Sequence, residues 1–473
     1  MKPWLIKTIS TLLSIVAVCI KNIDVKAIEN QPNCKNISEF YKNKALNFSD
    51  LINLGLCNDP KTKEAFEATM IQKHSLKKGY SDYMPRINAQ ASYRENKVNA
   101  ETSKLTTSNP NLISIAALTG GAINGKNDIQ SYGINFDWLI YDFGSREAGI
   151  STLKEKLKEY EYLQSNASQE IIFKITSLYY QYLSSEKELE AAIENEKLTT
   201  TLIKNAEIKQ KSGLASKLDK LQAESANAQA MILVLNSNAK LNIIKQKLKS
   251  AIHYSEMPLM QNQEKRNIIT IAERQNQMKN IETQINSEAK NSNHPLLKAA
   301  AAKINQQNQL IKKVILSNLP RISAIGGINK YDINSQGDFN INATNRYIGG
   351  QVTLPIFSGF SDIENINIAK RQRDFEIAQK ESLERNIEDE IIESYEELKA
   401  ISEGIVYAEN FLKVAIEAEN NARERYKLGV GNIIDVIHSQ SNLISAKENN
   451  AKMQYGWWIS KARFQKAMGM LYV

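Results

Sequence analysis

The chain has 473 residues, of which only 20 are glycine and 9 are proline, and its formal net charge at pH 7 is +8. Aromatic residues make up 7% and charged residues 24%, a composition typical of long helices with a polar surface. The basic residues form no stripe with interleaved aromatic side chains, so we expect no nucleic-acid binding.

The N-terminus predicts a secretory signal peptide over residues 1–27. Lysines precede an apolar run at 9–20, and a small residue, Ala27, ends a cleavage motif. The run is too short to span a bilayer. Cys19 could accept a lipid anchor, but the residue before it is bulky where lipidation wants a small one. Residues 28–48 lack periodicity and are expected to form an extended arm.

Two cysteines remain after cleavage, Cys34 and Cys57. In an exported protein an even pair indicates a disulfide, which would be worth roughly 3 kcal/mol on the chain-entropy model. Two independent buried thiols are the alternative.

A first repeat is predicted over residues 49–253, and it begins with two helices. Ser49 and Asp50 can cap the first of them. Pro60 suits the first turn of the second, which is expected to run to about Tyr80.

After this helical run the hydrophobic period changes from 3.6 to 2 residues. The alternation predicts strands over about 86–95 and 131–140, each with one apolar side. The polar stretch at 97–130 between them is rich in threonine and glycine and is expected to be a long loop.

A proline-free stretch from Ser145 to Ser212 follows, long enough for a single helix of roughly 100 Å. It ends at Gly213, and a shorter return helix is predicted over about 216–251. Helices of this length belong to coiled coils or supercoiled bundles, and the narrow apolar stripe favours a tube wall over a thick core.

The same order of elements recurs in a second repeat, residues 294–473. The predicted elements are strands over about 321–330 and 347–355, a helix over 360–428, a turn at Gly429 and a return helix over 432–468. Residues 254–293 are polar and are predicted to be a connector, with a short helix around 271–285.

Four strands with one apolar side each are what a transmembrane β-barrel needs. Two soluble hairpins that each cover a patch of core are the alternative. Aromatic residues near the strand ends suit a girdle at the membrane boundary, and they are Tyr83, Trp138, Tyr141, Tyr331 and Tyr347.

No catalytic or metal-binding pattern emerges. Asp142-Phe143-Gly144 resembles a kinase signature but lacks its companion motifs. The histidines are far apart in the sequence, at His74, His253, His294 and His438. We therefore expect no enzyme, no metal and no other cofactor.

In this duplicated order the features resemble the TolC-like outer-membrane channel proteins of Gram-negative bacteria, over about residues 47–469. The carriers are the helix–proline–strand junctions at Pro85 and Pro320, the turns at 138–144 and 354–359, and Tyr426-Lys427-Leu428-Gly429 followed by Ile433-Ile434-Asp435-Val436. The paired cysteines look more like members that serve type I protein secretion than like drug-efflux members.

The resemblance implies an α+β membrane protein, a homotrimer in which four strands from each chain close one twelve-stranded barrel surrounded by outer-membrane lipid. Below it the helices would form a periplasmic tunnel, with the connector in a belt around its middle. Such a protein is a passive exit duct for type I protein secretion or multidrug efflux. It is opened by a periplasmic adaptor and an inner-membrane ABC or proton-driven transporter. A periplasmic coiled-coil adaptor or structural protein is the alternative.

The resemblance also implies a gate at the periplasmic end. Asp435 matches the gate aspartate, Asp219 is its equivalent in the first repeat, and Tyr426 matches a tyrosine whose polar contacts hold the gate shut. His438 stands where a second aspartate is often found, and Gly431 where a basic latch residue can occur. Three Asp435 carboxylates on one axis would repel each other and attract cations.

Each gate residue has a simpler interpretation as well. The aspartates could be first-turn carboxylates favoured by the helix dipole, and His438 could be a packed or solvated histidine. The two helix turns, Gly213-Leu214 and Gly429-Val430, are the predicted docking surface for the adaptor.

Overall fold

The computed structural model describes residues 34, 46–99, 124–253, 277–279, 293–335 and 340–471. They divide into two compact units, each described separately. The sheet unit comprises the described residues of 72–157 and 303–375, and the hairpin unit those of 29–71, 158–302 and 376–473. Each unit draws on both sequence repeats, so the repeats are not themselves the compact units.

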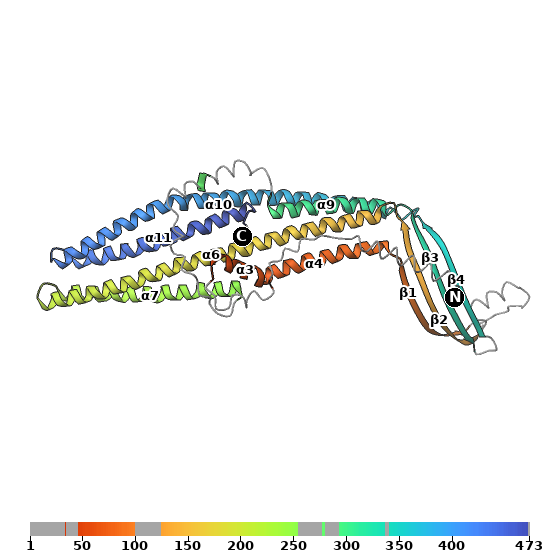
Figure 1. The fold of residues 1–473 in the computed structure, drawn as a ribbon, viewed down its shortest axis with the longest axis horizontal. Coiled ribbons are helices and arrows are strands. Elements are labelled where there is room, and N and C mark those ends of the chain that lie inside the picture. The colour runs from red at the N-terminus through yellow and green to blue at the C-terminus, as the bar shows by residue number, and fades with distance from the viewer. Residues whose placement is uncertain are drawn as a thin grey trace, which may run out of the picture. The chain divides into compact units, whose positions relative to one another are not determined.

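The sheet unit holds one antiparallel sheet with the strand order β1-β2-β3-β4 (Figure 1). The strands are β1 (Arg86–Asn99), β2 (Asn124–Tyr141), β3 (Arg321–Ser335) and β4 (Asn340–Thr353). The central pair, β2 and β3, joins the two repeats. The alternative of two separate hairpins is therefore wrong.

The strands run further than the alternating pattern predicts. Lys97 pairs with Lys126 and Asn99 with Asn124, so both ends of the predicted loop belong to the sheet. Polar residues continue the ladder there because backbone groups, and not side chains, make its hydrogen bonds. Residues 100–123 lie outside the described part of the chain.

The register places the apolar sides of all four strands on one face. Ile87 pairs with Phe136, Phe136 with Gly326, and Gly326 with Ile348. A Cβ on Gly326 would lie 2.2 Å from the Phe136 ring, so glycine there makes room for the neighbouring ring. Ile87 is 69% exposed and Ile348 is 84% exposed in the single chain. This apolar face therefore covers no core among the described residues.

The opposite face is polar. Asn329 Nδ2 donates to Asn135 Oδ1 at 3.1 Å, and the Tyr347 hydroxyl donates to the same oxygen at 3.2 Å. Side chains alternate along a strand, so Tyr331 and Tyr347 lie on this polar face. The predicted aromatic girdle is therefore wrong for these two residues.

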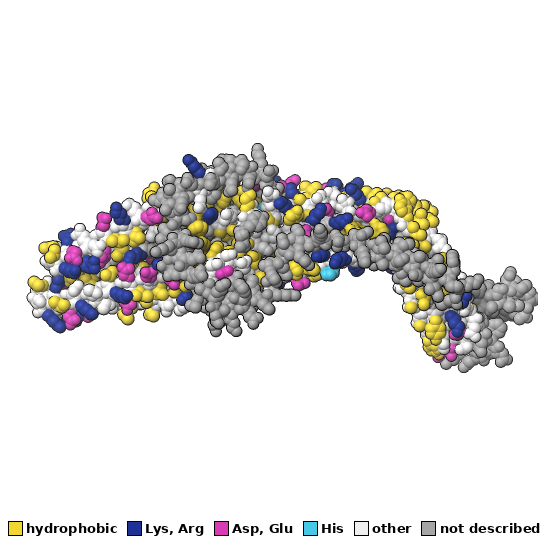
Figure 2. Space-filling model, viewed as in Figure 1, with side chains coloured by type: hydrophobic (Ala, Val, Ile, Leu, Met, Phe, Trp, Pro, Cys, Tyr) yellow, Lys and Arg dark blue, Asp and Glu magenta, His cyan; other side chains and the backbone are white. Residues whose placement is uncertain are grey.

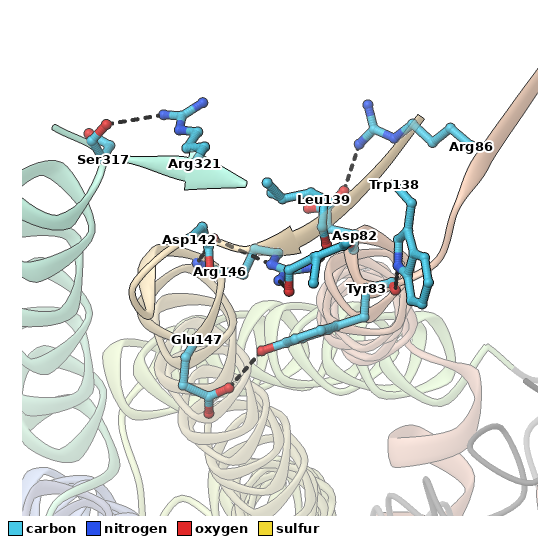
Figure 3. Close-up of polar contacts among 11 residues, drawn as sticks. Asp82, Tyr83, Arg86, Trp138, Leu139, Asp142, Arg146, Glu147, Ser317 and Arg321 are labelled. Carbon is cyan, nitrogen blue, oxygen red and sulfur yellow. Dashed lines mark hydrogen bonds and ion pairs between the residues drawn. The ribbon is translucent and has the colours of Figure 1, made fainter. Parts of the chain in front are cut away.

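A buried arginine ties the sheet to the helix that follows it (Figure 3). The Arg146 guanidinium donates to the carbonyl oxygens of Asp82, Leu139 and Ile140 at 3.2, 2.7 and 2.9 Å. Its Nε lies 3.3 Å from the Asp142 carboxylate, and the arginine side chain is only 10% exposed. One cation thus joins the end of β2, the approach to β1 and the start of the long helix.

Tyr83 closes the same junction (Figure 3). The Arg146 guanidinium stands 4.5 Å from the centre of its ring, and its hydroxyl donates to Glu147 at 2.9 Å. Trp138 Nε1 donates to the Tyr83 carbonyl at 2.9 Å. Tyr83 and Trp138 therefore lie at one end of the sheet, as predicted.

The second repeat builds its junction differently. Asp362 follows the turn and accepts a hydrogen bond from Ser358. Phe357 and Phe360 form an edge-to-face pair with centroids 5.5 Å apart, and both rings are exposed. The left-handed residues are Phe143 and Gly144 in the first turn and Gly359 and Phe360 in the second. The predicted glycine-to-glycine match is thus offset by one residue.

Helices supply the rest of the fold. They are α3 (Phe48–Asn58), α4 (Pro60–Tyr80), η1 (Ser81–Tyr83), α6 (Ser145–Lys211), α7 (Lys217–Ile252), α9 (Pro295–Leu316), α10 (Ser361–Lys427) and α11 (Ile433–Ala467). Within the hairpin unit α6 and α7 form one antiparallel hairpin, and α10 and α11 form the other (Figure 1). None of the helices in the described part of the chain is both long and apolar enough to span a bilayer.

The N-cap of the first helix lies two residues before the predicted cap, Ser49. Asn47 is the N-cap, and its side chain accepts from the Asp50 amide at 2.8 Å. Asp50 accepts in return from the Asn47 amide at 3.0 Å, which completes a capping box. Ser49 therefore lies inside the helix and does not cap it.

The main core of the hairpin unit forms where α3, α6, α7 and α11 meet. Its buried members include Leu51, Leu54, Ile171, Ile175 and Leu248. Elsewhere the helices carry narrow apolar seams, and Figure 2 shows cationic and anionic side chains interspersed along their visible face.

A disulfide joins Cys34 to Cys57 at the end of α3, with a Cα–Cα distance of 5.4 Å. The bond attaches the predicted arm to the core of the hairpin unit. Of the connector helix expected around 271–285, residues 277–279 are described and are helical. The remainder of that helix, like the signal peptide, lies outside the described residues.

Candidate gate at the helix-turn tips

Both long helices end in the same glycine-dependent turn. Gly213 has φ 73° and Gly429 has φ 79°, the left-handed region that favours glycine. The Leu214 amide donates to the Lys209 carbonyl at 2.8 Å, and the Val430 amide donates to the Arg425 carbonyl at 3.0 Å. These are the long-range bonds of Schellman motifs, which satisfy the last carbonyl groups of a helix.

The return helices begin with equivalent polar caps. Ser216 caps α7 and accepts from the Asp219 amide at 3.2 Å, and Asn432 caps α11 and accepts from the Ile434 amide at 3.1 Å. Asp219 and Asp435 both lie in the first turn, where the helix dipole favours a carboxylate. The simpler interpretation of both aspartates is therefore compatible with the structure.

Asp435 and His438 lie on the exposed side of α11, whereas Val436 between them is fully buried. The hairpin packing therefore presents both titratable groups outward from the same helix. The side chains of Leu214 and Val430, at the turns themselves, are 78% and 68% exposed.

Tyr426, by contrast, is buried at 4% exposure. It belongs to an apolar cluster with Leu202 and Ala206 of α6 and Val436 of α11. Burial raises the pKa of the Tyr426 phenol, and the negative charge of Asp219 raises it further. The structure thus brings Asp219 and Tyr426 together from opposite hairpins.

The hydroxyl of Tyr426 has no hydrogen-bond partner among the described residues. The contacts that locate this side chain are made by its ring and its backbone. The polar contact that the resemblance implies for this tyrosine is therefore absent from the described part of the chain.

Lys209 is the residue at this site that sequence reasoning missed. Its Nζ stands 4.1 Å from the centre of the Tyr426 ring and donates to the Tyr426 carbonyl oxygen. The two residues are 217 positions apart, and no motif links them in the sequence. Only docking of one hairpin against the other reveals the contact.

Gly431 lies against the end of α10. A Cβ at this position would lie 3.0 Å from backbone atoms of Arg425 and Tyr426. A basic side chain at 431 would therefore need the backbone to move, and the cation at this site comes from α6 instead.

A duplicated unit of paired strands and long helical hairpins, with an uncovered apolar sheet face, defines the class of outer-membrane channel protomers. The family model described as outer membrane efflux protein matches residues 51–252 and 287–470. The chain belongs to this family. It is accordingly a protein of the Gram-negative outer membrane that extends into the periplasm.

Solved structures share the fold at low identity. The CmeC outer membrane channel of Campylobacter jejuni is 18% identical, with a TM-score of 0.69, 95% of this chain covered and 91% of that one. The outer membrane protein VceC of Vibrio cholerae is 16% identical, with a TM-score of 0.70 and coverages of 93% and 99%. A membrane protein of Pseudomonas aeruginosa is 16% identical, with a TM-score of 0.72 and coverages of 91% and 92%. No curated protein sequence matches the chain.

Proposed function

We propose that three copies of the chain form the outer-membrane exit duct of a tripartite export system. The observation that carries the proposal is the sheet. Among the described residues its two edge strands, β1 and β4, each pair on one side only, and its apolar face is exposed. In lipid, open sheet edges are not tolerated, so three sheets closing into one barrel would satisfy the backbone and place the apolar face against acyl chains.

The duct is passive and has no catalytic role. The difference between the two faces of the sheet supports a water-filled pore. Its polar face, around Asn135, Asn329 and Tyr347, would line the lumen. Residues 1–27 would be removed on export, residues 28–48 would form the arm, and 254–293 the connector of a periplasmic belt. A periplasmic adaptor, the alternative from sequence, would not explain two helical hairpins that each follow a pair of strands, and the family match does not support it.

The proposal is tested by purifying the chain in detergent and measuring its mass and its conductance in planar bilayers. The expected result is a trimer that forms discrete pores. A detergent-free soluble monomer, with Ile87 and Ile348 protected from a membrane-restricted probe, would overturn the proposal.

The gate of the duct would lie at the helix-turn tips. Asp435 and His438 would face the pore as titratable rings, while Asp219 and Tyr426 would hold the hairpins against each other. The exposed turns Gly213-Leu214 and Gly429-Val430 would dock the adaptor. Their exposed apolar side chains support this role, because a bound partner would remove that apolar surface from water.

The kind of molecule exported would be set by the inner-membrane partner of the duct. The family description supports efflux. Multidrug efflux through a periplasmic adaptor and a proton-driven or ABC transporter is accordingly the first candidate. Type I protein secretion is the second candidate, and the Cys34–Cys57 bond favours it through the resemblance. Co-purification of the inner-membrane partner after cross-linking at Leu214 distinguishes the two systems.

A further inference from the structure

We infer that Lys209 is a positioning residue that clamps the second hairpin to the first at the candidate gate, through the face of the Tyr426 ring and its carbonyl. The expected effect on leak conductance rests on the proposed channel function. The clamp itself is a contact within one chain.

The Tyr426 carbonyl is an effective acceptor for a cation from another helix. It belongs to the last turn of α10, where the carbonyl groups carry the negative end of the helix dipole. It already accepts from the Gly429 amide at 3.2 Å, and Lys209 supplies its second donor. The charged donor makes this bond stronger than one between neutral groups.

The ring holds the same ammonium group from a second direction. A cation 4.1 Å from a ring centre lies within the range of an attractive cation–π contact. Lys209 makes no ion pair with a carboxylate in the described part of the chain, whereas nearby Lys211 and Lys220 both pair with Glu207. Within the described part of the chain, both the ring contact and the hydrogen bond of its ammonium group are with Tyr426.

The Tyr426 hydroxyl, which has no hydrogen-bond partner among the described residues, shows which part of this residue makes the clamp. A buried hydroxyl without a partner costs free energy, so it cannot be what holds the side chain in place. The ring and the carbonyl carry the contact. The clamp therefore predicts that Tyr426→Phe keeps the gate closed, whereas removal of the lysine charge releases it.

The test measures the full-length protein in planar bilayers with four single variants at Lys209 and Tyr426, one double variant and one control. Lys209→Met should raise leak conductance about tenfold, because it removes both the cation–π contact and the charge-assisted hydrogen bond. Tyr426→Leu removes only the ring contact and keeps the carbonyl acceptor, so it should raise leak conductance less than Lys209→Met does. Lys209→Arg and Tyr426→Phe should stay near the wild type. The double variant should leak little more than Lys209→Met alone, because Lys209→Met already removes the ring contact that Tyr426→Leu removes.

Lys211→Met is the matched control, because Lys211 lies two residues away on α6 and its ion pair is exposed. Equal conductance of Lys209→Met and Lys211→Met would overturn the clamp. Equal melting temperatures with a higher leak only in Lys209→Met would separate positioning from a general loss of stability.

If the wild type forms no pores, the proposed function is overturned. A second measurement then still tests the clamp. Amide hydrogen exchange at residues 427–434 should be faster in Lys209→Met than in Lys211→Met. Unchanged exchange in this turn would overturn the clamp, whatever the conductance of the protein.

Discussion

The imidazole of His294 donates a hydrogen bond to the backbone carbonyl of Lys466, while its Nδ1 accepts from the Leu296 amide at 3.2 Å. One buried neutral histidine thus joins the end of α11 to the first turn of α9. Protonation would remove the acceptor that Leu296 needs. It would also place a positive charge beside the positive end of a helix.

This arrangement predicts a loss of stability in acid. Burial lowers the pKa of His294 below its ordinary value of 6.5; Glu390 opposes that shift, and the Lys466 ammonium adds to it. The unfolded chain then binds more protons, so the free energy of unfolding should fall as the pH drops below about 6.5. Thermal unfolding of the wild type and of His294→Gln between about pH 5 and pH 8 measures how much of the pH dependence of stability His294 contributes. An identical pH dependence in both proteins would contradict the assignment.

The Arg146 junction predicts a large effect from a single substitution. Arg146→Met leaves three backbone carbonyls and Asp142 without their cation, which should cost about 3 kcal/mol of unfolding free energy. Arg86→Met is the control, because its 2.8 Å pair with Asp82 is exposed and should contribute less than about 1 kcal/mol. Denaturant titration compares the two, and equal losses would argue against a special role for Arg146.

Asp435 is predicted to restrict ion flow at the gate. Asp435→Ala should raise leak conductance several-fold and weaken cation selectivity, because it removes one carboxylate per chain from the constriction. Glu424→Ala, on the exposed end of α10, serves as the comparison. Unchanged selectivity in Asp435→Ala would leave only the helix-dipole interpretation of this residue.

The segment between β1 and β2 is predicted to be dispensable for folding. Asn99 and Asn124 are direct partners in the ladder, so an Asn-Gly turn can replace residues 100–123. The shortened chain should still assemble, as the second repeat connects its strands with a much shorter segment. Failure to form the trimer on native gels would show that the segment contributes to assembly.

Reduction of the Cys34–Cys57 bond should loosen the arm without altering the pore. The bond closes a loop with a sequence separation of 23, worth roughly 3 kcal/mol on the chain-entropy model. A proteolysis time course with and without reductant should show earlier cleavage before α3 at equal conductance. A changed conductance would place the arm closer to the pore than proposed.

Local sequence determines much of this protein. The change of period at Arg86 and Arg321 marks where strands begin, because alternation and the 3.6-residue period are properties of single segments. Proline-free stretches give α6 and α10 their length, since no proline interrupts either helix. Even so, the local pattern predicts Ser49 as the cap of the first helix, whereas the structure caps it with Asn47.

Tertiary structure alone decides which of these segments meet. Pairing of β2 with β3, the bond from Arg146 to the Asp82 carbonyl and the approach of Lys209 to Tyr426 all join residues that are far apart along the chain, with no local signal to link them. Such contacts arise when helices and strands dock to bury apolar surface, and the partner of each polar group is then set by packing geometry. The candidate gate residues can therefore be proposed one by one from the sequence, whereas the contact between Lys209 and Tyr426 cannot.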